Sequence, residues 1–166
     1  DSPIVTSEFF KQELETQTIK ATQVFDSRPP SFQKPLKYQS HIYQSFVGWK
    51  INTREQKFDP KTVVMMDFNI PQNEFTQFVY VLPFDENTAL IELTRFGANI
   101  LEKDEANTIL SAFIKKSAED YDVLEYEHGV IPMSSAKLKT DKYGKNWINM
   151  GSRADILKAS TGYAFH

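Results

Sequence analysis

The sequence predicts an α+β protein in which one mostly antiparallel β-sheet is backed by one long helix. Extended segments rich in Val, Ile, Phe and Tyr follow one another through short polar connections, as antiparallel neighbours do. One later segment repeats its apolar residues at helical spacing instead. The chain has 166 residues, of which 40% are hydrophobic and 25% charged. This balance suits a globular domain with a sizeable core.

The N-terminal part is expected to form a short helix over residues 7–15, capped by Ser7, and then a strand over residues 19–25. Pro29 and Pro30 follow, and proline is excluded from helix interiors and from central strands. Residues 29–35 are therefore the best candidate for a linker.

The central part is expected to hold the sheet. A helix is expected after its first strands, over residues 105–121 and capped by Asp104, because Ile109, Leu110, Phe113 and Ile114 form one apolar stripe. The expected strands cover residues 41–53, 62–70, 74–84 and 88–96 before the helix, and residues 123–133 and 147–150 after it.

Composition excludes several classes of function. A net charge of −3 with a pI near 5.6 argues against a nucleic-acid partner. The chain has no cysteine, no glycine-rich phosphate loop and no Gly-x-Ser-x-Gly elbow. His41, His128 and His166 lack ligand-like spacing, so no metal site is expected. The longest apolar run, at 78–84, is too short to cross a bilayer as a helix.

Two carboxylates inside predicted strands are the candidate chemical groups. Alternation along the strand places Glu92 on one face with Leu90, Thr94 and Phe96, while Ile91, Leu93 and Arg95 point to the other. Burial among apolar neighbours would raise the pKa of Glu92 and suit it to act as a general acid. A solvent-exposed face, or an ion pair with Arg95, is the alternative. Asp67 raises the same question.

Motifs spread along the chain resemble those of one family. VFDSRP at 24–29, QSFVGW at 44–49 and MDF at 66–68 are similar to the "FDSRP", "QxFxGW" and "MDF" motifs of the lycopene cyclase family of flavoproteins. FVYVLPF at 78–84 resembles "FxYxLPF", and LIELT at 90–94 lies at the place of "FLEET", of which it keeps the first glutamate. GVIPM at 129–133 and STGYAF at 160–165 complete the series in the order of the family.

The resemblance implies a flavoprotein hydroxylase-like fold, of which this chain would be mainly the substrate domain. Residues 1–30 would be a remnant of the FAD domain, residues 31–150 the antiparallel substrate-binding domain, and residues 151–166 the return toward the FAD domain. The dinucleotide-binding Gly-x-Gly-x-x-Gly is absent, and the "GS/TxGG" motif reads GSRAD at 151–155. Because the first residue is Asp1 and not Met, the chain is expected to be an excised piece or a processed chain. Alone, it is expected neither to bind FAD nor to be active.

The same resemblance implies an enzyme that closes the end groups of an acyclic carotenoid, such as lycopene, into rings by acid-catalysed chemistry without net redox change. Reduced FAD would stabilise the cationic transition state. The roles that it implies are proton donation by Glu92 with Asp67 as a second carboxylate, a substrate tunnel lined by Phe46, Trp49, Phe68, Phe78 and Tyr80, and contacts to FAD from Asp26, Arg28, Gly151, Ser152, Thr161 and Gly162.

Asp26 and Arg28 are expected near Gly151–Arg153, at the join with the FAD domain. The complete protein is expected to be cytoplasmic and peripheral to the membrane, because carotenoids partition into bilayers. Two other functions stay open on sequence alone. One is a non-catalytic module that binds an apolar ligand. The other is a different flavoprotein of the same fold, such as a prenyl reductase or a hydroxylase.

Overall fold

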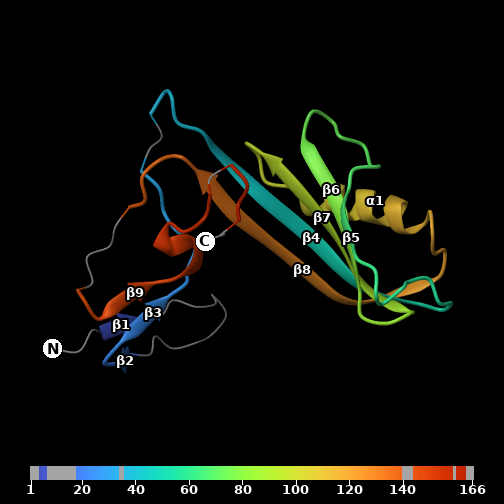
Figure 1. Ribbon diagram of the computed structural model, residues 1–166, viewed down its shortest axis with the longest axis horizontal. Helices are drawn as coiled ribbons and strands as arrows, with labels where there is room; N and C mark the ends of the chain where they lie inside the picture. Colours follow the sequence, from blue (N-terminus) through green and yellow to red (C-terminus); the bar gives the residue numbers. More distant parts are fainter. Residues whose placement is uncertain (1–3, 7–17, 34–35, 140–143, 159, 164–166) are drawn as a thin grey trace. The chain divides into compact units, whose positions relative to one another are not determined.

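The computed structural model describes residues 4–6, 18–33, 36–139, 144–158 and 160–163 (Figure 1). It divides into two compact units. Unit 1 comprises Asp1–Gln39 and Ser134–His166, and unit 2 comprises Ser40–Met133. Residues 31–39 and 134–150 thus group with the terminal segments, whereas the sequence analysis grouped them with the sheet.

Unit 2 is built on a five-stranded sheet with the strand order β5-β6-β7-β4-β8. Its strands pair antiparallel from β5 through β6 and β7 to β4. The bounds are β4 His41–Thr53, β5 Val64–Asp67, β6 Thr76–Pro83, β7 Thr88–Gly97 and β8 Tyr121–Ser134. The prediction of a mostly antiparallel α+β fold is confirmed, and β4 has the bounds expected from the sequence.

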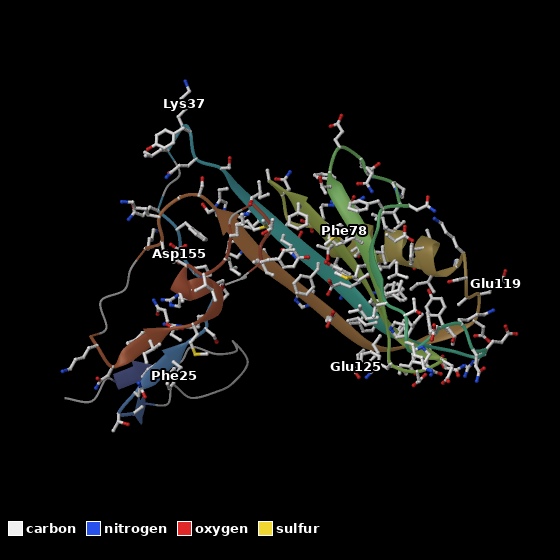
Figure 2. The ribbon with its side chains drawn as sticks, in the orientation of Figure 1. Phe25, Lys37, Phe78, Glu119, Glu125 and Asp155 are labelled. Atoms are coloured by element: carbon white, nitrogen blue, oxygen red, sulfur yellow. The ribbon has the colours of Figure 1, made fainter. Side chains whose placement is uncertain are left out.

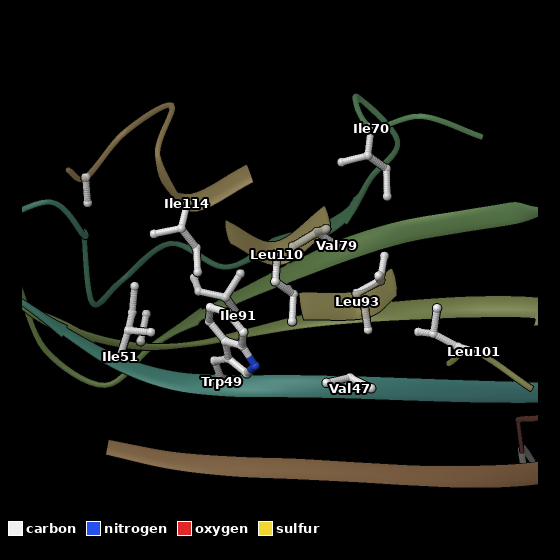
Figure 3. Packing of buried hydrophobic residues seen from close by; sticks show 13 residues of the cluster. Val47, Trp49, Ile51, Ile70, Val79, Ile91, Leu93, Leu101, Leu110 and Ile114 are labelled. Atoms are coloured by element: carbon white, nitrogen blue, oxygen red, sulfur yellow. The ribbon is translucent and has the colours of Figure 1, made fainter. Parts of the chain in front are cut away.

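The only helix of the described part of unit 2, α1 (Lys103–Ile114), packs against β7 and β4 on one face of the sheet. Its apolar stripe meets the inward side chains of three strands and forms the core (Figure 3). Burying such side chains contributes about 1.5–3 kcal/mol each. The largest members of the core are Trp49, Ile51, Ile70, Ile91, Leu93, Leu101, Leu110 and Ile114.

Both predicted ends of this helix are wrong. The N-cap is Glu102, which makes no side-chain capping bond, and Asp104 lies inside the first turn, where its charge still favours the helix N-terminus. The helix ends at Ile114, and Tyr121 begins β8. Pairing with β4 provides backbone partners for residues from Tyr121 onward, so tertiary structure overrides the helical pattern there.

The strand β5 is shorter than the expected 62–70. Its register against β6 shifts between Val64 and Asp67, and Met66 has a φ of 61°. A left-handed backbone at a non-glycine residue interrupts regular pairing. Because of this irregularity, β5 keeps only two register pairs with β6, Val64 with Val81 and Asp67 with Val79.

Unit 1 contains two small sheets. β1 (Ile4–Thr6) pairs antiparallel with β2 (Thr18–Lys20). β3 (Val24–Asp26) pairs parallel with β9 (Trp147–Asn149), which leads into the 3-10 helix η1 (Gly151–Ala154). The strand expected over 19–25 is therefore two strands, interrupted at residues 21–23. The helix expected over 7–15 lies outside the described residues.

Candidate active site

The two faces of β7 have different partners. Ala89, Ile91 and Leu93 belong to the core beneath α1. Glu92 therefore points to the opposite face, which we call the open face of the sheet. The face assignment predicted from alternation is confirmed for these residues.

Aromatic side chains form a cluster on the open face beside Glu92. The ring of Phe78, on β6 (Figure 2), lies at the centre and is 3% exposed. It makes edge-to-face contacts with Phe68 and Tyr80, with ring centroids 5.3 and 5.1 Å apart, and a tilted contact with Phe96 at 6.1 Å. Such contacts hold rings in fixed orientations. The helix α1 covers the other face of the sheet. On the open face, the contacts among the rings themselves hold a π-rich surface in place.

Glu92 is half-buried in this surface. The strand register puts Tyr80 of β6 and Gly48 of β4 directly opposite it. The Thr94 hydroxyl donates a 3.0 Å hydrogen bond to Glu92 Oε1. Arg95 does not pair with it, because its guanidinium lies on the helix side and binds Glu105 through two bonds of 2.8 and 2.5 Å.

These surroundings raise the pKa of Glu92 to about 7. Burial is the largest cause, because it disfavours the charged form. A hydrogen bond with Glu127 and repulsion from its charge add to the increase, while the bond from Thr94 opposes it. A carboxyl group with this pKa is about half protonated at neutral pH, and a pKa near the working pH suits a general acid.

Glu127 comes from β8, on the far side of β4 from Glu92. It reaches across β4 at Gly48, where a methyl carbon would lie 2.7 Å from both Cγ and Oε1 of Glu127. Gly129 has a similar relation to Phe46, whose ring occupies the space that a side chain at 129 would need. Two glycines of the recognised motifs thus make room for a carboxylate and an aromatic ring.

Four of the five predicted tunnel residues lie on the open face with Glu92, namely Phe46, Phe68, Phe78 and Tyr80. Trp49 does not. It is opposite Ile91, it belongs to the core beneath α1, and its ring meets Tyr126 at 6.0 Å.

Asp67 is also separated from Glu92. It pairs with Val79, whose side chain belongs to the core, so its own side chain lies on the helix side of the sheet. There its Oδ1 accepts a 2.8 Å bond from the Asn69 amide. It lines a cavity of about 250 Å³ together with Phe58, Val81 and Phe113. The two predicted carboxylates therefore do not form one site.

The residues expected to contact FAD lie in unit 1, where Asp26 forms an ion cluster. Its carboxylate accepts bonds of 2.9 and 2.8 Å from Arg28, is 2.8 Å from Arg153 Nε, and accepts a 3.1 Å bond from the Trp147 indole. The Arg28 bonds are the main reason that the pKa of Asp26 falls to about 2. Arg153 belongs to η1, so the expected proximity of the motif to residues 151–153 is confirmed.

Of the other four residues, Gly151 and Ser152 lie in η1, and Thr161 and Gly162 lie in a turn. Gly151 and Gly162 have φ angles of 57° and 72°, which glycine adopts without strain. Ser152 is in η1, and the Thr161 and Gly162 amides both donate to the Lys158 carbonyl.

Two further features are absent from the described ranges. No group of three or more His, Asp or Glu side chains there could hold a metal ion. Within the same ranges, no helix combines the length and apolarity that crossing a membrane requires.

Sequence reasoning missed three residues of the open face. Phe96 was placed on the correct face but not assigned to the site. Glu127 and the close approach at Gly48 depend on β8 lying next to β4, and no local sequence signal shows this pairing. Alternation along β8 alone could have suggested only that Glu125 and Glu127 share a face.

Comparison with known proteins agrees with this architecture. The family described as "Lycopene cyclase protein" matches residues 7–166. The lycopene beta-cyclase of Paracoccus sp. (strain N81106 / MBIC 01143) is 25% identical over 150 residues, which are 88% of this chain and 38% of that protein. The lycopene beta-cyclase of Pseudescherichia vulneris is 29% identical over 131 residues, which are 74% of this chain and 32% of that protein.

A solved structure shares the fold. The geranylgeranyl bacteriochlorophyll reductase-like protein from Thermoplasma acidophilum matches with a TM-score of 0.56 and 17% sequence identity. The match covers 90% of this chain and 38% of that one. At this identity the likeness concerns the fold alone.

The fold and the site define an α+β protein whose antiparallel sheet carries a half-buried acid on an aromatic face. Within that class, the match over almost the whole chain shows the family: the chain belongs to the lycopene cyclase family. It spans between about a third and two fifths of the length of the curated relatives it matches.

Proposed function

We propose that this chain is the substrate-binding part of a lycopene cyclase, and that Glu92 donates the proton that starts ring closure. The observation that carries the proposal is the environment of Glu92. The side chain has a pKa raised to about 7, lies half-buried on an aromatic face, and is separated from Arg95 by the sheet.

The reaction begins with transfer of the proton from a carboxyl oxygen of Glu92 to the terminal alkene of an acyclic carotenoid. The tertiary cation that results is attacked by the neighbouring alkene, and loss of a proton completes the ring. Rings such as Phe78 and Tyr80 present negative π faces that can stabilise the cation. The apolar surface also excludes water, which would otherwise trap the cation.

Of the residues expected to contact FAD, Gly151 suits such a contact and Asp26 does not. Beside Gly151, the described atoms leave open the space that a side chain would fill, which allows a flat ring to approach the backbone. Asp26 does not fit a direct contact, because its oxygens are already bound by Arg28, Arg153 and Trp147. When bound, reduced FAD would supply an electron-rich group able to stabilise developing positive charge.

A membrane contact is part of this proposal, because the substrate partitions into bilayers. Val63, Met65 and Phe68 are 56%, 64% and 51% exposed along and beside the edge strand β5, and they are the proposed contact. With a net charge of −3, attachment should depend on apolar contact and only weakly on salt. Flotation of this chain with vesicles should survive high salt and decrease in Met65→Asp. Flotation lost at moderate salt would contradict the proposal.

The experiment for the catalytic role is the turnover of lycopene by a complete enzyme that contains this chain, with reduced FAD supplied. Glu92→Gln keeps the shape of the side chain and removes its proton, so turnover should fall by about 10²–10⁴-fold. Asp67→Asn is the matched control, because it makes the same change on the opposite face of the sheet. Turnover should remain close to normal in this control. Near-normal turnover in Glu92→Gln would remove Glu92 from the mechanism.

A further inference from the structure

The relation between Glu92 and Glu127 is unusual for a β-sheet. Neighbouring strands lie about 4.8 Å apart, so residues on strands separated by a third strand are about 10 Å apart at the backbone. Glu92 is on β7 and Glu127 on β8, with β4 between them. Any side chain on β4 at this level would stand between the two carboxyl groups.

Gly48 removes that barrier. It is directly opposite Glu92 in the β4–β7 register, and the Glu127 side chain lies over it. A methyl group at this position would be 2.7 Å from Cγ and Oε1 of Glu127 and 3.1 Å from Cδ. Contacts below 3.0 Å do not persist, so the flexible end of Glu127 would have to move away. The glycine therefore determines whether the two carboxyl groups can meet.

The charged groups around the pair are otherwise engaged. Lys50, from β4, binds Glu125 of β8 at 2.7 Å, and its ammonium lies 5.2 Å from the Phe84 ring centroid. Tyr80 faces Glu92 from β6. Two carboxylates held together without a bound cation cannot both ionise readily, and sharing one proton is the lower-energy state.

We propose that Glu127 is a positioning residue for Glu92, and that the two carboxyl groups share one proton across Gly48. The proposal rests on the proposed function, since the shared proton is the one given to the alkene. When it leaves, the O–H bond of Glu92 breaks, its electron pair stays on the carboxylate, and a C–H bond forms on the substrate. The pair is then doubly negative beside the carbocation. The proton lost from the ring returns to the pair, so the reaction is redox-neutral.

The test is a carbon-13 NMR titration of the glutamate carboxyl groups in the complete 166-residue chain. Spectra of Glu92→Gln and Glu127→Gln assign the two resonances. In the unsubstituted chain, coupled groups should each report the same two titration steps. In Glu127→Gln, the pKa of Glu92 should fall. For a coupling of about one pH unit, the protonated fraction of Glu92 at pH 7 would drop from about one half to about one tenth.

Gly48→Ala keeps both glutamates and separates them, so each resonance should then titrate in a single independent step. Glu125→Gln is the matched control, because it removes the next acidic side chain on the same face of β8, which Lys50 already neutralises. The two-step titration of Glu92 should persist in this control.

An unchanged Glu92 titration in Glu127→Gln, or a coupled titration that survives Gly48→Ala, would overturn the proposal. These outcomes are distinct from failure of the proposed function. If the titrations are coupled as expected but Glu92→Gln retains lycopene turnover, the proposal of a shared proton is supported and the proposal that Glu92 is the proton donor is contradicted.

Discussion

Asp26 in unit 1 and Glu92 in unit 2 are both carboxylates of recognised motifs, and both are withdrawn from solvent. Asp26 is surrounded by donors from Arg28, Arg153 and the Trp147 indole, and the hydrogen bonds from Arg28, with the charge of Arg153, lower its pKa to about 2. Glu92 lies on an aromatic face beside a second carboxylate, and burial, followed by the interaction with Glu127, raises its pKa to about 7. At neutral pH the same functional group is fixed as an anion in one region and is about half protonated in the other.

The comparison shows that a motif carboxylate acquires its role from its neighbours. A carboxylate bound by two guanidinium groups cannot give up a proton at neutral pH, and its contribution is to hold β3, β9 and η1 together. A carboxylate without a cation partner can donate a proton, but it destabilises the fold when it ionises. The first role is structural, and the second is compatible with chemistry.

The largest effect that this comparison predicts is on stability. Asp26→Asn removes the charge that neutralises Arg153, whose side chain is only 12% exposed. Breaking such a buried pair should lower the free energy of unfolding of unit 1 by about 3 kcal/mol. Hydrogen exchange of the β3 amides measures this local stability. Glu92→Gln at pH 5, where Glu92 is protonated, should change the stability of unit 2 by less than about 0.5 kcal/mol. If Asp26→Asn and Glu92→Gln lowered the free energy of unfolding equally, the proposed difference between the two carboxylates would be contradicted.

A smaller effect concerns pH, and the two regions should respond with opposite sign. The pKa of Asp26 is lowered from 3.8 to about 2, so the unfolded chain binds more protons in this range and stability falls as pH drops through it. The pKa of Glu92 is raised from 4.5 to about 7, so the folded chain binds more protons there and stability falls as pH rises. Thermal unfolding of each variant across pH checks this. Asp26→Asn should remove the pH dependence of stability only in the acid range, between pH 2 and 3.8. Glu92→Gln should remove it only between pH 4.5 and 7.

Local patterns predicted the parts of the fold that depend on neighbours in sequence. Alternation placed Glu92, Thr94 and Phe96 on one face of β7 because a strand has a period of two residues. Prediction failed where distant pairing decides the structure. Tyr121 leaves the helical pattern because β8 pairs beside β4.

For the candidate site too, the residues set by local patterns could be predicted, and those set by pairing between distant strands could not. Glu92 and most of its aromatic neighbours follow from motifs and alternation. Trp49 lies one residue from Gly48, and that single step along β4 moves its side chain to the core. Asp67 follows a shift in register at Met66, and Glu127 reaches Glu92 only through a gap in a third strand. Neither relation has a local signature in the sequence.

The central claim is that the protonated form of Glu92 is the reactive one. The direct measurement is kcat/KM for lycopene against pH, in a complete enzyme containing this chain with reduced FAD supplied. We expect kcat/KM to decline as pH rises through about 7, the pKa of Glu92, because the acid loses its proton there. Glu92→Gln should lack this decline and retain only low residual activity. A rate that increases through the same range would show that the ionised carboxylate is needed, and would contradict the assignment of Glu92 as the proton donor.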